Sequence, residues 1–359
     1  MTAVTSPPVV DGDALMGFVF RAIDEVGASL NCALVVMGDR LGYYRALAEQ
    51  GPLAPNALAD LTNTAEPYAR EWLAAQAAGG YLGYDPETLT YSISPEVAVA
   101  MTDESSPAYL PGFFQFAYGT IGDADRIFEA AGTGDGVGWH EHNSHVRDGC
   151  ERFFRPGYLA NLVASWLPAL EGVVAKLEAG ATVADVGCGH GSSTVLLAQT
   201  YPSARIYGSD YDATAIEVAR ERAREAGVAD RARFEVAGAN GFSGRGLDLV
   251  TTFDALHDMG DPVGAARHVY DALADDGAWM VVEPAAGDHV EDNLTTVGRV
   301  YYGFSTLLCT PGSLSQDVGL ALGAQAGPAK IRDVVTAAGF TRFRIAAQTP
   351  LNTIFEIRK

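Results

Sequence analysis

A glycine-rich loop is the part of the sequence whose residue types point most directly to a chemistry. Residues 185–191 read Asp-Val-Gly-Cys-Gly-His-Gly, after an apolar run and before a helix-like segment. Glycines let a chain turn tightly and let a ligand lie against bare backbone. In open α/β sheets, ligands bind at the carboxyl edge of the strands, where this loop would lie. The loop predicts a site for a nucleotide-like ligand, with Gly187, Cys188, Gly189 and Gly191 against it.

Two acids decide which ligand the loop fits. Asp185 precedes the first glycine, and Asp210 ends the next predicted strand, where a carboxylate can accept both hydroxyls of a ribose. NAD is the alternative, but a dinucleotide loop aims its helix at a pyrophosphate, which a carboxylate at Asp185 would repel. The same carboxylate suits the sulfonium and ammonium groups of S-adenosylmethionine (SAM). We therefore predict SAM as the cofactor and no metal ion.

The elements that must position this loop alternate between strand and helix. Strands are predicted at 182–186, 205–209, 233–236, 247–253 and 278–282, with helices at 192–200, 213–226 and 262–273. A helix at 329–338 and strands at 342–347 and 353–357 complete the pattern. Such alternation predicts an α/β, Rossmann-like fold, in which helices cover both faces of a parallel sheet.

The first half of the chain has a different pattern of predicted elements. Apolar residues recur at helical spacing from about Gly12 onward, then come two short helices and a hairpin with its turn at 85–87. Helix, turn, helix and a two-stranded wing are typical of a winged-helix fold. We therefore expect four regions: a flexible tail (1–12), a winged-helix domain (13–104), an aromatic-rich helical connector lining the active site (105–175) and the α/β domain (176–359).

Three segments together resemble a known family. The Asp-x-Gly-x-Gly-x-Gly loop, the acid at Asp210 and the segment 237–240 are similar to motifs I, II and III of the class I SAM-dependent methyltransferases. The winged-helix half resembles a branch of small-molecule O-methyltransferases that includes bacterial proteins. The resemblance implies a seven-stranded sheet whose last strand is antiparallel. It also implies that Tyr211, Ala239 and Asn240 contact the cofactor, although the family often has an acid where Asn240 stands.

The resemblance also implies which residues carry the reaction. An enzyme that transfers the methyl group of SAM mainly aligns the reacting atoms and excludes water. A hydroxyl acceptor must also lose its proton, and a base of near-neutral pKa assists this. Residues 253–262 resemble the His-Asp-x-x-Asp segment of plant-type O-methyltransferases, which makes His257 the base. Glu283 corresponds to the acid that orients this histidine, and Phe253 and Asp254 fall at the cofactor edge.

Several of these residues have other interpretations. His257 could instead close the strand by a backbone hydrogen bond, and Asp258 fits a cofactor-side contact and a loop-stabilising contact equally. Asp261 before a proline is more typical of a helix N-cap than of a substrate contact. The second acid that the family carries near its final helix is missing, because Gln325 or Pro328 stands there.

Aromatic residues and histidines supply the remaining candidates. We expect Phe154 to pack over the methionine end of SAM. The predicted lining of the acceptor pocket comprises Trp139, His142, Tyr301, Tyr302 and Phe304. Trp139 and His142 belong to the histidine-rich segment 139–145. This segment could cover the active site, form a plain surface loop or bind zinc, but its spacing fits no helical pair of metal ligands.

Charge and composition limit the partners. The net charge is −21, and Arg70 is the one basic residue between positions 51 and 104. A recognition helix needs basic side chains to meet phosphates, which argues against nucleic acid and against a winged-helix transcription regulator that senses SAM. The sequence shows neither a signal peptide nor an apolar run long enough to span a membrane. Four scattered cysteines are typical of reduced thiols.

These observations lead to one expected function and its alternatives. We expect a cytoplasmic SAM-dependent methyltransferase that acts on a hydroxyl of a small molecule. In the resembling enzymes, the first half builds a homodimer and covers the acceptor pocket, which the apolar helix predicted at 19–47 could do here. N-methylation, C-methylation and a SAM-binding enzyme with another reaction are the alternatives.

Overall fold

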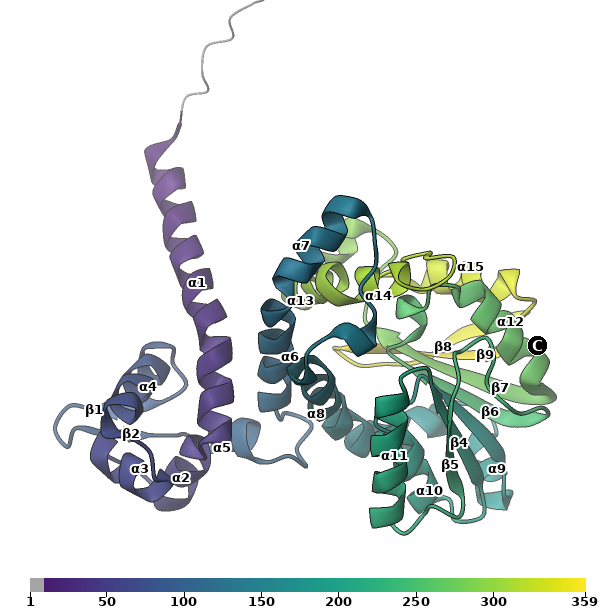
Figure 1. Ribbon diagram of the computed structural model, residues 1–359, viewed down its shortest axis with the longest axis horizontal. Helices are drawn as coiled ribbons and strands as arrows, with labels where there is room; N and C mark the ends of the chain where they lie inside the picture. The colour runs from purple at the N-terminus through teal and green to yellow at the C-terminus, as the bar shows by residue number, and fades with distance from the viewer. Residues whose placement is uncertain (1–9) are drawn as a thin grey trace, which may run out of the picture. The chain divides into compact units, whose positions relative to one another are not determined.

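The computed structural model describes residues 10–359, and Figure 1 shows the course of the chain. The predicted flexible tail, 1–12, falls largely outside the described residues. Asp11, at its end, is the N-cap of the first helix and accepts hydrogen bonds from two backbone amides of that helix.

The chain divides into two compact units. The first comprises the residues up to Asp103 together with Tyr109–Tyr118, and the second comprises Glu104–Ala108 and Gly119–Lys359. The aromatic-rich segment predicted as a connector thus contributes to both units.

The first unit is mostly helical and carries a short hairpin. Its elements are α1 (Gly12–Arg40), α2 (Tyr43–Gln50), α3 (Pro55–Thr62), α4 (Glu66–Ala78), β1 (Gly83–Asp85), β2 (Thr90–Ser92) and α5 (Pro95–Thr102). The two strands pair antiparallel, which confirms the predicted winged helix. The single helix expected at 19–47 is wrong, because the chain breaks before α2. Gly42 there has a φ of 75°, a left-handed conformation that ends a helix and that glycine adopts without strain.

Aromatic packing holds this unit together. The ring of Trp72 meets Tyr43 and Tyr44 edge-on at centroid distances of 4.9 and 5.0 Å, an arrangement favoured by the ring quadrupoles. The Trp72 indole N–H donates to the Leu34 carbonyl at 2.8 Å. Gly38 is required beneath this ring, because a Cβ there would lie 2.3 Å from it.

The second unit is built on a seven-stranded sheet. Its strands are β3 (Thr182–Val186), β4 (Arg205–Asp210), β5 (Ala232–Val236), β6 (Leu247–Phe253), β7 (Leu273–Pro284), β8 (Arg342–Gln348) and β9 (Asn352–Arg358). Their order is β5-β4-β3-β6-β7-β9-β8. Strand β9 runs antiparallel to both of its neighbours, and the other pairings are parallel. The predicted Rossmann-like sheet with an antiparallel last strand is therefore confirmed.

Helices cover both faces of this sheet (Figure 1). One face packs against α9 (Val173–Ala179), α10 (Ser192–Thr200) and α11 (Ala213–Glu225), and the other against α12 (Pro262–Ala272) and α15 (Pro328–Ala337). Each face has its own core of apolar side chains, because strands buried on both sides carry apolar residues on both faces.

Further helices precede the sheet in the chain or lie between its strands. They are α6 (Pro111–Gly122), α7 (Ala124–Thr133), η1 (Trp139–Glu141), α8 (Ser144–Asn161), η2 (Leu162–Trp166), η3 (Leu167–Ala169), η4 (Leu256–Asp258), η5 (Val290–Asn293), α13 (Thr296–Phe304), η6 (Ser305–Cys309) and α14 (Thr310–Leu314). Among the described residues, no helix is by itself long and apolar enough to cross a membrane, whereas the bent pair 144–169 and 173–179 passes that test on length and composition.

Candidate active site

The loop between β3 and α10 requires its glycines. Gly187, Gly189 and Gly191 have φ values of 74°, 50° and 75°, in the region that only glycine enters readily. A Cβ on Gly191 would lie 2.8 Å from the Ala219 Cβ, so the loop must be bare where α11 packs against it. A Cβ on Gly189 would meet nothing within 4 Å. This side of the loop is therefore open, and a ligand can lie along its backbone.

Asp185 lies beneath the loop and not on its open side. Its buried carboxylate accepts hydrogen bonds from Ser193 and Thr194 at 2.6 Å each and from Thr251 at 2.9 Å. Burial raises the pKa of this carboxyl, and the three hydroxyl donors partly oppose that rise. The predicted contact between Asp185 and a cationic ligand stays a prediction. Because its oxygens face hydroxyls of α10 and β6, Asp185 fastens the loop to its surroundings.

Asp210 closes the same loop from the end of β4. Its Oδ2 accepts from the Gly189 amide at 3.0 Å, and its Oδ1 accepts from the Asp212 amide at 2.9 Å. Burial raises the pKa of this carboxyl. Each carboxylate oxygen has two acceptor sites, so capacity remains for the hydroxyls of a ribose. Tyr211, beside it, is 41% exposed.

The segment after β5 adjoins the backbone of Asp210. The Ala237 amide donates to the Asp210 carbonyl at 2.9 Å, which joins the end of β5 to the end of β4. Residues 239–241 then form a turn in which Ala239 is half-buried and Asn240 is exposed. Their contact with the cofactor stays a prediction.

His257 and Glu283 meet as the resemblance implies. His257 lies in η4, directly after β6, and Glu283 lies near the end of the adjacent strand β7. The His257 Nδ1 is 2.5 Å from the Glu283 Oε2, and the other carboxylate oxygen accepts the Leu256 amide at 3.0 Å. Both side chains are buried. The alternative in which His257 bonds backbone is not observed, and Glu283 fixes both the orientation of the ring and its tautomer.

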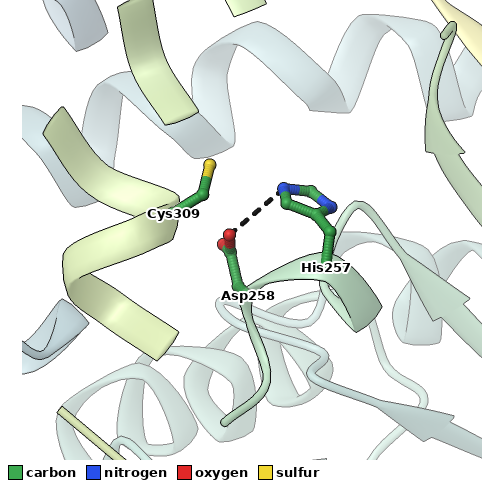
Figure 2. Close-up of side chains that lie close together, drawn as sticks. All are labelled: His257, Asp258 and Cys309. Carbon is green, nitrogen blue, oxygen red and sulfur yellow. Dashed lines mark ion pairs between the residues drawn. The ribbon is translucent and has the colours of Figure 1, made fainter. Parts of the chain in front are cut away.

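A second carboxylate faces the other nitrogen of the ring. The Asp258 Oδ1 lies 3.1 Å from the His257 Nε2, as the dashed line in Figure 2 marks. Burial alone would lower the pKa of His257, but the negative charges of Asp258 and Glu283 outweigh it and hold that pKa well above its ordinary value. The two carboxylates therefore favour the protonated form of the His257 imidazole.

Asp254 is strained and incompletely satisfied. It follows β6 with a φ of 46°, uncommon for a residue with a side chain. Its Oδ1 accepts from the Asn352 amide group at 2.9 Å, whereas its Oδ2 is buried without a hydrogen-bond partner. Burial, reinforced by Glu283, raises the pKa of this carboxyl well above its ordinary value. A buried polar atom without a partner next to the glycine loop suits a ligand that brings a donor.

Two family models match the chain in the regions just described. The "Methyltransferase domain" model covers residues 177–322, and the "Rv2258c-like winged HTH domain" model covers residues 29–103. The first spans the glycine loop, Asp210, His257 and Glu283. Residues 177–322 therefore carry a methyltransferase domain, as the resemblance to the class I SAM-dependent methyltransferases implies. SAM, the cofactor predicted from the loop, is the cofactor of this family.

Similarity to known proteins supports the presence of a methyltransferase domain. Trans-aconitate 2-methyltransferase of Paracidovorax citrulli is 32% identical over 108 residues, which is 30% of this chain and 40% of that protein. The matched segments of the curated relatives thus span less than half of those proteins. A putative O-methyltransferase from Nostoc punctiforme shares the fold over 98% of this chain and 100% of its own, with a TM-score of 0.70 and 20% identity. Human N-acetylserotonin methyltransferase, solved with SAM, has a TM-score of 0.69 and 16% identity, covering 98% and 99% of the two chains.

Trp139 bridges two parts of the methyltransferase site. Its indole N–H donates to the Asp258 Oδ2 at 3.1 Å, and its backbone amide donates to the Tyr211 hydroxyl at 3.1 Å. The aromatic ring of His140 meets Tyr211 edge-on at 6.2 Å. The segment η1 therefore lies against both Tyr211 and Asp258, which favours the cover among the three interpretations of segment 139–145.

The side chain of His142 pairs with an acid outside this segment. It is 3% exposed, and its Nδ1 lies 2.9 Å from the Asp123 Oδ2, which also accepts the Asn143 amide at 3.0 Å. This pairing anchors the segment to the start of α7. Placement of His142 in the acceptor pocket therefore stays a prediction. The zinc interpretation gains no support within the described residues, where the group of side chains close enough to hold a metal ion is a different one.

The predicted aromatic contacts form a chain of rings. Phe154 stacks on Tyr158 at 6.2 Å, and Tyr158 meets Phe253 at 5.1 Å, at the end of β6. Two predicted residues, Phe154 and Phe253, are thus connected through Tyr158, which sequence reasoning missed. The periodicity of α8 could have indicated Tyr158, because it lies four positions after Phe154 and on the same helix face.

The three aromatic residues of α13 have different surroundings. Tyr301 is buried and donates its hydroxyl to the Leu351 carbonyl at 2.8 Å. Tyr302 lines a cavity of about 190 Å³ with Gln325, Lys330 and others. Phe304 is half-buried at the end of the helix. The structure therefore does not gather all three around one point, and their role toward the acceptor stays a prediction.

Two residues near His257 carry no sequence signal. Cys309, the last residue of η6, offers its sulfur within 4.8 Å of ligand atoms of His257 and Asp258, and burial raises the pKa of its thiol to about 12. Asn352 reaches Asp254 from the first residue of β9. Neither stands in a recognisable motif, since both are brought in by elements distant in sequence.

Proposed function

We propose that the chain transfers the methyl group of SAM to a hydroxyl group of a small molecule, with His257 as the general base. The observation that carries this proposal is the 2.5 Å contact between the His257 Nδ1 and the Glu283 Oε2. A carboxylate on Nδ1 directs the basic lone pair to Nε2 once that nitrogen is deprotonated. This pair lies at the same carboxyl edge of the sheet as the glycine loop.

The residues around the loop fit SAM. The open side of Gly189 leaves room for a ligand against the backbone. Asp210 retains acceptor sites for ribose hydroxyls, and the orphaned Asp254 Oδ2 can receive an ammonium or hydroxyl donor. When bound, SAM supplies an electrophilic methyl carbon. The protein aligns that carbon with the acceptor oxygen and keeps water away.

The proton follows a defined route. For His257 to act as a base, its Nε2 proton must leave, and the acceptor hydroxyl must take the place beside Nε2 that now faces Asp258. The oxygen of the acceptor then gains the methyl group while its proton passes to Nε2. Glu283 stabilises the imidazolium that forms, as expected for a buried carboxylate on Nδ1.

A homodimer is part of this proposal. The first two-thirds of α1 exposes Met16, Phe18, Phe20, Ile23, Val26 and Leu30, each about half exposed or more. Exposed apolar groups of this size mark an interaction surface. We propose that a second copy of the chain covers these side chains. The other partners in this proposal are small molecules, and not nucleic acid or membranes. The proposed location of the enzyme is the cytoplasm.

The test pairs a binding measurement with a rate measurement. Calorimetric titration with S-adenosylhomocysteine, and with NAD as the control, should give binding of the first only. With an acceptor found by screening phenols and other hydroxyl compounds, His257→Ala should lower the rate of methyl transfer by about 10²–10⁴-fold while S-adenosylhomocysteine binds as before. An unchanged rate would exclude the base and favour methylation of nitrogen or carbon.

A further inference from the structure

We propose that the His257 Nε2, the Asp258 Oδ1 and the Cys309 Sγ form a binding site for Zn²⁺, and that Zn²⁺ bound there blocks methyl transfer. The three side chains come from two elements, η4 and η6, and Figure 2 shows them close together, with Asp258 and His257 joined as an ion pair and Cys309 nearby. Their ligand atoms all lie within 4.8 Å of one another, and all three residues are buried.

The distances fit a tetrahedral zinc site after a small adjustment. Bonds of about 2.0–2.3 Å to nitrogen, oxygen and sulfur place neighbouring ligand atoms roughly 3.3–3.7 Å apart. The nitrogen of His257 and the oxygen of Asp258 are already 3.1 Å apart. The sulfur of Cys309 lies within 4.8 Å of both atoms, so it must approach them by about 1.5 Å at most. Three protein ligands leave the fourth position to water.

The Asp258 Oδ1 is the second, independent sign of a ligand. The residue is 8% exposed, and this oxygen is buried without a hydrogen-bond partner, although the His257 Nε2 lies at ion-pair distance from it. A buried carboxylate oxygen without a hydrogen bond is costly. A cation between this oxygen and the imidazole nitrogen would satisfy both.

The outer partners of these residues are those of a metal site. The ring nitrogen of His257 that faces away from the cluster is held by the carboxylate of Glu283 at 2.5 Å. The second oxygen of Asp258 is held by the Trp139 indole at 3.1 Å. Carboxylates and other groups that fix the far side of a ligand orient it and raise its basicity. The cluster therefore has oriented ligands before any ion arrives.

The kinds of donor atom select the metal. One imidazole nitrogen, one carboxylate oxygen and one sulfur suit zinc, whereas magnesium and calcium take oxygen ligands almost alone. The nearby carboxyl groups of Asp254 and Glu283 add negative charge when ionised, which also favours a cation. Zinc would occupy the same lone pair of His257 that the proposed function uses for the acceptor proton, so the inhibition, but not the binding, rests on that function.

Binding can be tested without any acceptor. The metal-free protein is titrated with Zn²⁺ by calorimetry and with Co²⁺ by absorption spectroscopy, with Mg²⁺ as the control ion. We expect one Zn²⁺ per chain, no binding of Mg²⁺, and a thiolate-to-cobalt charge-transfer band. Cys309→Ser should remove that band and weaken Zn²⁺ binding by at least ~10-fold. Cys32→Ser, which removes a half-buried cysteine of α1, should leave both unchanged.

The outcomes separate the site from the function. A cobalt spectrum without the thiolate band, or equal Zn²⁺ affinity in the wild type and in Cys309→Ser, would overturn the site. If Cys309→Ser does not fold, Asp258→Asn provides the second test, with the same weakening expected. With a methyl acceptor available, Zn²⁺ should inhibit in competition with the acceptor. Zn²⁺ that binds but does not inhibit would leave the site standing and remove the base role of His257.

Discussion

The replacement Glu283→Gln is the sharpest perturbation of this site. The two oxygens of Glu283 accept from two different donors, the His257 Nδ1 and the Leu256 amide. Glutamine has the same shape but only one acceptor oxygen, and the other end of its amide donates. Because the Leu256 amide is part of the backbone and always donates, it takes the oxygen. The amide NH₂ of the glutamine then faces the His257 Nδ1.

This arrangement predicts the size of the effect. To accept from the glutamine, Nδ1 must give up its proton, so the neutral ring carries its proton on Nε2 and cannot act there as a base. General-base catalysis contributes about 10²–10⁴-fold, or roughly 3–5 kcal/mol at ~1.36 kcal/mol per factor of ten. We expect kcat to fall by that factor. The affinity for S-adenosylhomocysteine should stay the same, because Glu283 does not belong to the glycine loop.

Two measurements check this reasoning. Nitrogen NMR of the imidazole reports the tautomer directly and needs no acceptor: neutral His257 should carry its proton on Nδ1 in the wild type and on Nε2 in Glu283→Gln. Steady-state rates over a range of pH then give kcat. In the wild type the rate should rise as the pH rises through the elevated pKa of His257, because only the deprotonated ring accepts a proton.

A matched control excludes a general effect of charge. Glu225→Gln removes an exposed carboxylate at the end of α11 and should change neither the tautomer nor the rate. Thermal unfolding of both variants shows whether the fold survives. The reasoning is refuted if folded Glu283→Gln keeps the wild-type tautomer and a rate within threefold of the wild type (about 0.65 kcal/mol).

Three further changes have defined outcomes. Asp185→Ala removes the acceptor of three buried hydroxyl donors. At about 1 kcal/mol per hydrogen bond, it should lower the free energy of unfolding by roughly 2–4 kcal/mol. A free energy of unfolding within about 1 kcal/mol of the wild type, measured with denaturant, would contradict this role. Gly191→Ala places a Cβ 2.8 Å from Ala219 at a φ of 75° and should cost about 1–3 kcal/mol and weaken S-adenosylhomocysteine binding, as calorimetry can show. Phe20→Asp combined with Ile23→Asp should convert a dimer into a monomer in analytical ultracentrifugation, and a persisting dimer would place the interface elsewhere.

Some of the site could be predicted because it depends only on topology. The carboxyl ends of adjacent parallel strands meet at one edge of the sheet. His257 after β6 and Glu283 at the end of β7 therefore had to be neighbours once the strands were recognised. The glycines of the loop were predictable for a similar reason, because their backbone angles exclude other residues.

Other features depend on directions that a sequence does not record. Asp185 was expected to face the ligand, yet its oxygens face α10 and β6, and nothing in the order of residues says on which side of a strand end a carboxylate will lie. Cys309 reaches His257 only through the packing of η6. The break before α2 was missed because the apolar periodicity continues through Gly42, whose left-handed backbone redirects the chain.

The two hydrogen bonds of Trp139 couple events at opposite ends of the site. Its backbone amide depends on the Tyr211 hydroxyl, beside the cofactor loop, and its ring depends on Asp258, beside the acceptor position. A ligand that moves either partner loosens the segment covering the other. One hydrogen bond of about 1 kcal/mol corresponds to roughly a fivefold change in affinity. On the proposed function, linkage makes that factor the same in both directions: a cofactor that moves Tyr211 would change the affinity for the acceptor as much as the acceptor changes the affinity for the cofactor.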